Sequence, residues 1–175
     1  MDLKLRSDVM QAKDSNIIYL ARNLVCTGSN YFDTGFAPFY GDTANSNFKI
    51  TIRIGSAGTN ANQSVVIGCK YEATLSGQQW PGFIVRFKTS TNTFDIGGYN
   101  YWAPKTSSII GKNLYIWRTG GKWYGQVEGE ETIHTLAVRV APFDQNIVIG
   151  AGEQTNHTKF RYSICNIDYV RIEYI

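Results

Sequence analysis

The last seventeen residues, KFRYSICNIDYVRIEYI at positions 159–175, have the composition of a long buried β-strand. Large apolar side chains alternate with polar ones at both ends of this stretch, which is typical of a strand that faces a core on one side. The alternation reverses around Asn166 and Asp168, which indicates either a β-bulge or burial of both faces. A strand this apolar needs neighbours on both sides. We therefore predict that it lies inside a sheet, beside an apolar strand near the start of the chain.

Shorter runs of the same kind precede this stretch and are separated by turn signals. Residues 48–54 (FKITIRI) alternate strictly, as a half-buried antiparallel strand does. Residues 113–118 and 122–127 are joined by Thr-Gly-Gly, a connection typical of a β-hairpin. Turn signals recur roughly every 8 to 12 residues, which predicts an all-β, two-sheet antiparallel β-sandwich. Further expected strands cover residues 17–26, 31–36, 64–70, 82–88, 93–102 and 143–152.

The length of 175 residues, 43% of them hydrophobic, suits one domain with a sizeable core. Seventeen glycines and only four prolines accompany many β-branched and aromatic residues, which favours strands over helices. Residues 1–16 are polar and mixed in charge, so we expect a short N-terminal arm or helix there. The predicted organisation is an arm at residues 1–16 and a single β-sandwich domain at residues 17–175.

Charge and cysteine usage narrow the classes of partner and compartment. The net charge is +3, but lysines and arginines occur singly along the chain, so we expect no nucleic-acid partner. No segment approaches the length of a membrane span or a signal peptide, which predicts no membrane partner and synthesis in a cytosol. Cys26, Cys69 and Cys165 stand alone in apolar runs, so we interpret them as buried thiols of a protein that folds under reducing conditions.

The order of segments resembles the concanavalin A-like jelly-roll module of the laminin-G-like type. The resemblance covers residues 24–175 and rests on YFDTG at residues 31–35, IGA at residues 149–151 and IDYVRIEY at residues 167–174. The last segment departs from the usual pattern because Glu173 is inserted before the tyrosine. Membership would imply two stacked antiparallel sheets in which the first and last strands are adjacent.

Modules of this kind occur in adhesins, carbohydrate-binding modules, glycan-degrading enzymes and bacteriophage tail or capsid proteins. A copy without a signal segment and with reduced cysteines is most similar to the phage type. The leading interpretation is therefore a non-enzymatic virion structural or adhesion protein: a capsid decoration, head fibre or tail component. Its partners would be other virion or surface proteins, further copies of itself in an oligomer or assembly, and cell-surface polysaccharide. A stand-alone carbohydrate-binding module, and a glycoside hydrolase or lyase, are the alternatives.

The sequence gives no catalytic constellation. Glucan-cleaving enzymes on this fold carry an E-x-D-x-E pattern, which places paired carboxylates side by side on one strand face. The nearest substitute here, EGEE at residues 128–131, falls in a glycine turn. His134 and His157 have no neighbouring nucleophile. We therefore predict a non-enzyme, although carboxylates from different strands can converge in ways that spacing does not reveal.

No cofactor is expected, with calcium left open. Relatives of this fold can bind calcium through loop carboxylates and carbonyls, and Asp33, Asp42 and Asp144 are the candidate ligands. No clustered D-x-D-x-D loop is present, so solvated turn aspartates are the favoured interpretation.

Aromatic residues beside amides supply the candidate binding site. Aromatic rings cover the apolar face of a pyranose while amides bond its hydroxyls, which suits glycan recognition. Packing at sandwich ends or between subunits is the simpler explanation and stays open. Trp117 and Trp123, on facing hairpin strands, are expected to pack in the core or between the sheets. The candidates for binding a glycan or a partner are Gln78, Gln79, Trp80, Tyr99, Asn100, Tyr101 and Trp102.

Overall fold

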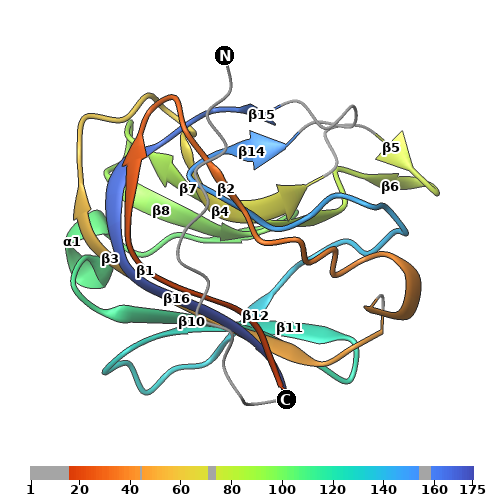
Figure 1. The fold of residues 1–175 in the computed structure, drawn as a ribbon. Helices are drawn as coiled ribbons and strands as arrows, with labels where there is room; N and C mark the ends of the chain where they lie inside the picture. The colour runs from red at the N-terminus through yellow and green to blue at the C-terminus, as the bar shows by residue number, and fades with distance from the viewer. Residues whose placement is uncertain (1–15, 44, 71–73, 154–158) are drawn as a thin grey trace.

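The computed structural model describes residues 16–43, 45–70, 74–153 and 159–175, and it shows two antiparallel sheets packed face to face (Figure 1). The first sheet contains, in spatial order, β1 (Ile17–Thr27), β16 (Ile164–Tyr174), β3 (Phe48–Ala57), β10 (Asn113–Thr119), β11 (Lys122–Val127) and β12 (His134–Leu136). The second sheet contains, in spatial order, β2 (Phe32–Asp33), β13 (Val148–Ile149), β4 (Val65–Lys70), β7 (Gly82–Lys88), β8 (Thr93–Gly97) and β9 (Tyr101–Trp102). The predicted all-β sandwich is confirmed.

Small elements complete the described chain. Two short hairpins pair β5 (Thr74–Leu75) with β6 (Gln78–Gln79), and β14 (Gly152–Glu153) with β15 (Lys159–Phe160). The helical segments are η1 (Gly41–Thr43) and α1 (Thr106–Ile109). Neither of these described helices is long and apolar enough to cross a membrane. The predicted N-terminal arm lies outside the described residues, except for Asn16.

The closing strand lies inside the first sheet, as predicted. β16 pairs with β1 on one side and with β3 on the other, so that Val170 lies between Ala21 and Ile52. Both Ile167 and Val170 are buried although they are three residues apart, and the β16–β3 register shifts on either side of Ile167. A bulge therefore explains the reversed alternation in the sequence.

The prediction of one strand over residues 159–175 is wrong at its start. Residues 159–160 form β15 in a separate hairpin, and β16 begins at Ile164. Between them the backbone of Arg161 has φ of 51°, a left-handed conformation that no strand residue maintains. The chain turns here, which directs Arg161 toward the outer face of the second sheet.

The core lies between the two sheets and is centred on Trp123. This side chain is 2% exposed, and its ring lies 5.3 Å from Phe48 of β3 and 5.2 Å from Phe83 of β7, measured between centroids. The expectation that Trp117 also packs in the core is wrong. Arg118 of β10 is the register partner of Trp123 and is buried like it. The preceding residue, Trp117, therefore points to the outer face of the sheet, where it stacks on Tyr124.

All three cysteines are buried thiols outside any disulfide, as predicted. Cys26 and Cys165 face each other across the β1–β16 pair. A hydrogen bond with Cys165, together with burial, raises the pKa of the Cys26 thiol above its usual range. Because the thiolate is the reactive form, neither accessibility nor ionisation favours attack on Cys26, and burial shields Cys165.

We expect the three thiols to react with Ellman's reagent at least tenfold more slowly in the native protein than in denaturing guanidinium. Full titration in guanidinium is the control, because it shows that the thiols are reduced. Fast reaction of even one thiol under native conditions would contradict the packing described for these strands.

Candidate ligand-binding site

A depression of about 250 Å³ lies on the outer face of the second sheet. It combines cationic, aromatic and amide side chains from three strands of the sheet (β4, β7 and β9) and from the loops around them. We refer to it as the cationic depression. Its lining residues are Gln63, Lys70, Trp80, Arg86, Tyr99, Tyr101 and Arg161.

Strand alternation places the charged side chains outside. In β7 the residues Phe83, Val85 and Phe87 belong to the core, so Arg86 faces away from it. The register sets Arg86 opposite Asp95 of β8, and a hydrophobic strand, β4, ends with the outward-facing Lys70. The sheet therefore positions these charges beside each other although the sequence separates them.

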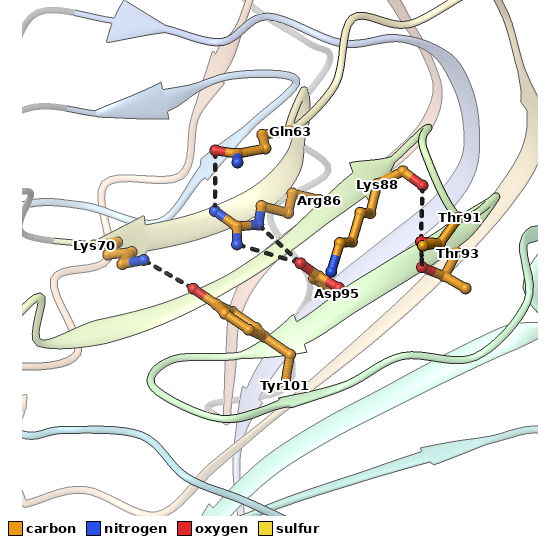
Figure 2. Close-up of polar contacts among 8 residues, drawn as sticks. All are labelled: Gln63, Lys70, Arg86, Lys88, Thr91, Thr93, Asp95 and Tyr101. Carbon is orange, nitrogen blue, oxygen red and sulfur yellow. Dashed lines mark hydrogen bonds and ion pairs between the residues drawn. The ribbon is translucent and has the colours of Figure 1, made fainter.

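Arg86 is fixed by a buried ion pair. Its Nη2 and Nε atoms lie 3.2 and 3.3 Å from Oδ2 of Asp95, and the two side chains are only 12% and 4% exposed (Figure 2). Nη1 lies 3.5 Å from Oε1 of Gln63, at the limit of hydrogen bonding. The guanidinium is thus held from one side by a carboxylate, which orients it toward the depression.

Lys70 is a second buried cation, 6% exposed. Its ammonium donates a hydrogen bond to the hydroxyl of Tyr101 at 3.0 Å (Figure 2) and lies 5.6 Å from the ring centroid of Trp80. Within the described residues this is the only hydrogen bond of the ammonium, although the group has three protons to donate. An acceptor on a ligand in the depression can take the remaining protons.

Three of the lining residues have left-handed backbones. The φ angles are 68° for Gln63, 53° for Trp80 and 51° for Arg161. Such a conformation costs roughly 1–3 kcal/mol for a residue other than glycine and persists where the surrounding structure enforces it. Their gathering around one depression is typical of a ligand site rather than of ordinary surface loops.

The ring of Tyr99 is held in place at the rim. Tyr99 is 50% exposed, and the guanidinium carbon of Arg139 lies 3.4 Å from its ring centroid. Arg139 in turn donates a hydrogen bond from Nη1 to the carbonyl oxygen of Gln79 at 2.9 Å. One face of the aromatic ring is thereby covered and its orientation is set before any ligand arrives.

The structure brings together three of the seven residues predicted from the sequence. Trp80, Tyr99 and Tyr101 line the cationic depression. Gln78 and Gln79 are exposed on β6 and do not line it, and Asn100 is exposed beside a backbone bridge to Ala137.

Trp102 lies on the other side of the sheet. It stacks on His134, with 4.0 Å between ring centroids, and packs against the core. Adjacent residues of a strand point to opposite faces, so Tyr101 and Trp102 were never able to share one site. The structure therefore does not bring Trp102 together with Tyr101 in the depression.

Sequence reasoning missed the charged half of the site. These cations come from segments far apart in the chain. Strand register brings Lys70 and Arg86 together, and the turn after β15 adds Arg161. A weak signal was present, since a lysine ends the otherwise apolar run 64–70. Lysines and arginines are spread singly along the sequence, but three of them meet at the cationic depression on the outer face of the second sheet.

The calcium candidates do not converge within the described residues. Oδ1 of Asp33 accepts hydrogen bonds from the amide of Gly35 and from Nδ2 of Asn146, both at 2.9 Å, as in a local turn. Asp144 lies between β12 and β13. The side chain of Asp42, in η1, is outside the described part of the structure. No three His, Cys, Asp or Glu side chains that the structure describes group as a metal site.

The carboxylates of the turn after β11 contact neighbouring residues of the first sheet. Glu128 accepts a hydrogen bond from the amide of Asn113 at 2.9 Å and lies 3.8 Å from Arg53. Glu130 lies 3.7 Å from Nε2 of His134. These carboxylates do not line the cationic depression, and His157 is outside the described residues.

The described architecture is a two-sheet antiparallel β-sandwich, and solved structures share it. No protein-family model and no curated protein matches the chain. A NanB sialidase from Streptococcus pneumoniae matches with a TM-score of 0.62 and 10% identity, over 90% of this chain and 26% of that one. The CBM40 domain of an IT-sialidase from Ruminococcus gnavus matches with a TM-score of 0.55 and 12% identity, over 89% of this chain and 91% of that one.

The same CBM40 domain was solved with α2,3-sialyllactose bound, and that structure matches with a TM-score of 0.55 and 11% identity. This chain spans about a quarter of the length of the NanB sialidase. Because the sequence identities are only 10–12%, these matches show a similarity of fold alone. None of these three structures is of a phage protein, so the virion role predicted from the sequence gains no support from them.

Proposed function

We propose that the protein is a non-enzymatic carbohydrate-binding module that binds an acidic sugar in the cationic depression. The observation that carries this proposal is the placement of three aromatic rings around two buried cations on one solvent-facing sheet. The CBM40 domain solved with sialyllactose has the same architecture, which supports a sugar as the ligand.

The chemistry of the depression fits an acidic pyranose. The rings of Trp80 and Tyr99 offer apolar surface for the C–H face of a sugar. Arg86 and Lys70 can bind its carboxylate through charge-assisted hydrogen bonds. The described lining contains no carboxyl group, whereas most glycoside hydrolases use two. Asp95, which contacts the lining, is already engaged by Arg86.

A glycan array that includes sialylated, uronic-acid and neutral glycans tests the proposal, followed by titration calorimetry with the best ligand. We expect an acidic glycan to bind, and Trp80→Ala or Tyr99→Ala to weaken its affinity about tenfold, since a stacked ring contributes on the order of 1–3 kcal/mol. Tyr40→Ala is the matched control, because Tyr40 is similarly exposed (58%) but does not line the depression. Absence of any glycan binding, or equal affinities for Trp80→Ala and Tyr40→Ala, would exclude this function.

A further inference from the structure

A further depression, of about 450 Å³, lies on the outer face of the first sheet, on the other side of the sandwich from the cationic depression. We refer to it as the aromatic depression. Its volume falls within the range of small-ligand pockets, about 300–1,000 Å³. Its lining residues are Lys49, Tyr115, Trp117, Gln126, Ile133 and Ile175.

Strand alternation directs aromatic rings to this face. In β10 the side chains of Leu114 and Ile116 belong to the core, so those of Tyr115 and Trp117 point outward. Two residue steps of a strand separate these two positions by about 7 Å. Tyr124 of β11 is the register partner of Trp117, and the two rings stack with 5.5 Å between centroids and 24° between planes. This contact orients the indole of Trp117 before any ligand arrives.

Groups that can bond the hydroxyls of a sugar stand beside these rings. Gln126 is the register partner of Tyr115, and its Nε2 donates a hydrogen bond to the carbonyl oxygen of Glu130 at 2.8 Å. The amide is thereby fixed, while its Oε1 accepts no hydrogen bond from the described residues. The hydroxyl of Tyr115 and the indole N–H of Trp117 likewise have no hydrogen-bond partner within the described part of the chain. The depression therefore offers both donors and acceptors to a ligand.

The lining carries less charge than that of the cationic depression. Lys49 is the one charged residue in the described lining, and its ammonium lies 4.7 Å from the ring centroid of Tyr115. The nearby Arg171 and Glu173 of β16 form an ion pair with each other. A single half-buried cation that already contacts an aromatic ring gives no strong preference for an acidic ligand. The rings and the amide therefore decide which class of ligand fits.

We propose that the aromatic depression is a second sugar-binding site, which takes a neutral oligosaccharide. The rings of Tyr115 and Trp117 cover the apolar C–H faces of its sugar units, and Gln126 bonds their hydroxyls. A protein partner fits this lining less well. Protein interfaces of standard size bury about 800 Å² per partner around an apolar centre, whereas the described lining has two aliphatic side chains, Ile133 and Ile175. The inference concerns another face and another ligand than the proposed function and does not depend on it.

Titration calorimetry with cellohexaose, xylohexaose, mannohexaose and maltohexaose tests this site. We expect at least one of these neutral chains to bind and Trp117→Ala to weaken its affinity about tenfold, as loss of a stacking ring does. Trp117→Phe, which keeps a ring but not the N–H donor, should have an intermediate affinity. Tyr40→Ala is the matched control, because Tyr40 is exposed and lines neither depression. Circular dichroism establishes that each variant is folded.

The outcomes separate this inference from the proposed function. A neutral chain whose binding is weakened by Trp117→Ala and not by Tyr40→Ala supports the second site, whether or not an acidic glycan binds the cationic depression. Binding of no neutral chain, or equal affinities for the two variants, overturns it and leaves the site at Trp80 and Tyr99 unaffected. Self-association that Trp117→Ala abolishes, without sugar binding, also overturns the inference, since this face would then contact a second copy of the chain.

Discussion

Asp95→Ala is expected to lower the free energy of unfolding by about 3–5 kcal/mol, because it leaves the guanidinium of Arg86 buried without its carboxylate. The remaining hydrogen bond within the described residues, to Gln63 at 3.5 Å, is too long to compensate, and the Tyr101 ring, whose centroid lies 4.6 Å from the guanidinium carbon, carries no full charge. Urea denaturation followed by circular dichroism measures the change. A loss below about 1 kcal/mol would mean that water reaches the pair far more easily than its burial indicates.

A double replacement separates the unpaired charge from lost packing. Arg86→Met/Asp95→Ala removes both charges, so its unfolding free energy should lie above that of Asp95→Ala alone. The same double variant should lose affinity for acidic glycans, since it retains the aromatic rings but lacks one of the cations that would contact the ligand. Stability and binding are thus expected to change in opposite directions between the two variants.

Trp123→Ala is expected to destabilise the protein by about 3–5 kcal/mol, as truncation of large buried aromatics does. Its ring contacts Phe48 in the first sheet and Phe83 in the second, so its loss opens a cavity between the sheets. Trp117→Ala is the matched control, with an expected change within about 1 kcal/mol, because Trp117 lies on the outer face. Chemical denaturation of the two variants checks this contrast, and similar losses would contradict it.

Much of the fold could be predicted from the sequence, because apolar and polar residues alternate along a strand that has one buried face. The closing strand and its pairing with the first strand followed from residues 159–175, and the structure decided for a bulge over burial of both faces. The start of β16 did not follow from them, because a left-handed residue such as Arg161 carries no signature that distinguishes it from a strand residue. The outward position of Trp117 was also missed. Which face of the sheet this side chain occupies follows from the pairing of β10 with β11.

The candidate site was predictable only in part. Trp80, Tyr99 and Tyr101 stand near each other in the sequence among turn residues, so their aromatic character drew attention. Lys70 and Arg86 are ordinary charged residues of two strands, and their meeting depends on long-range pairing that a sequence does not display. Composition gave a net charge of +3 but no information on where that charge gathers.

The adjacency of β1 and β16 has a consequence for how such a domain joins other proteins. Ile17, where β1 begins, is the register partner of Glu173, next to the end of β16. The first and last strands of the sandwich therefore begin and end close together. Insertion of a domain into a surface loop of another protein requires the two ends of the inserted domain to lie close together. The sandwich meets this requirement, so its insertion would separate the two ends of such a loop only slightly.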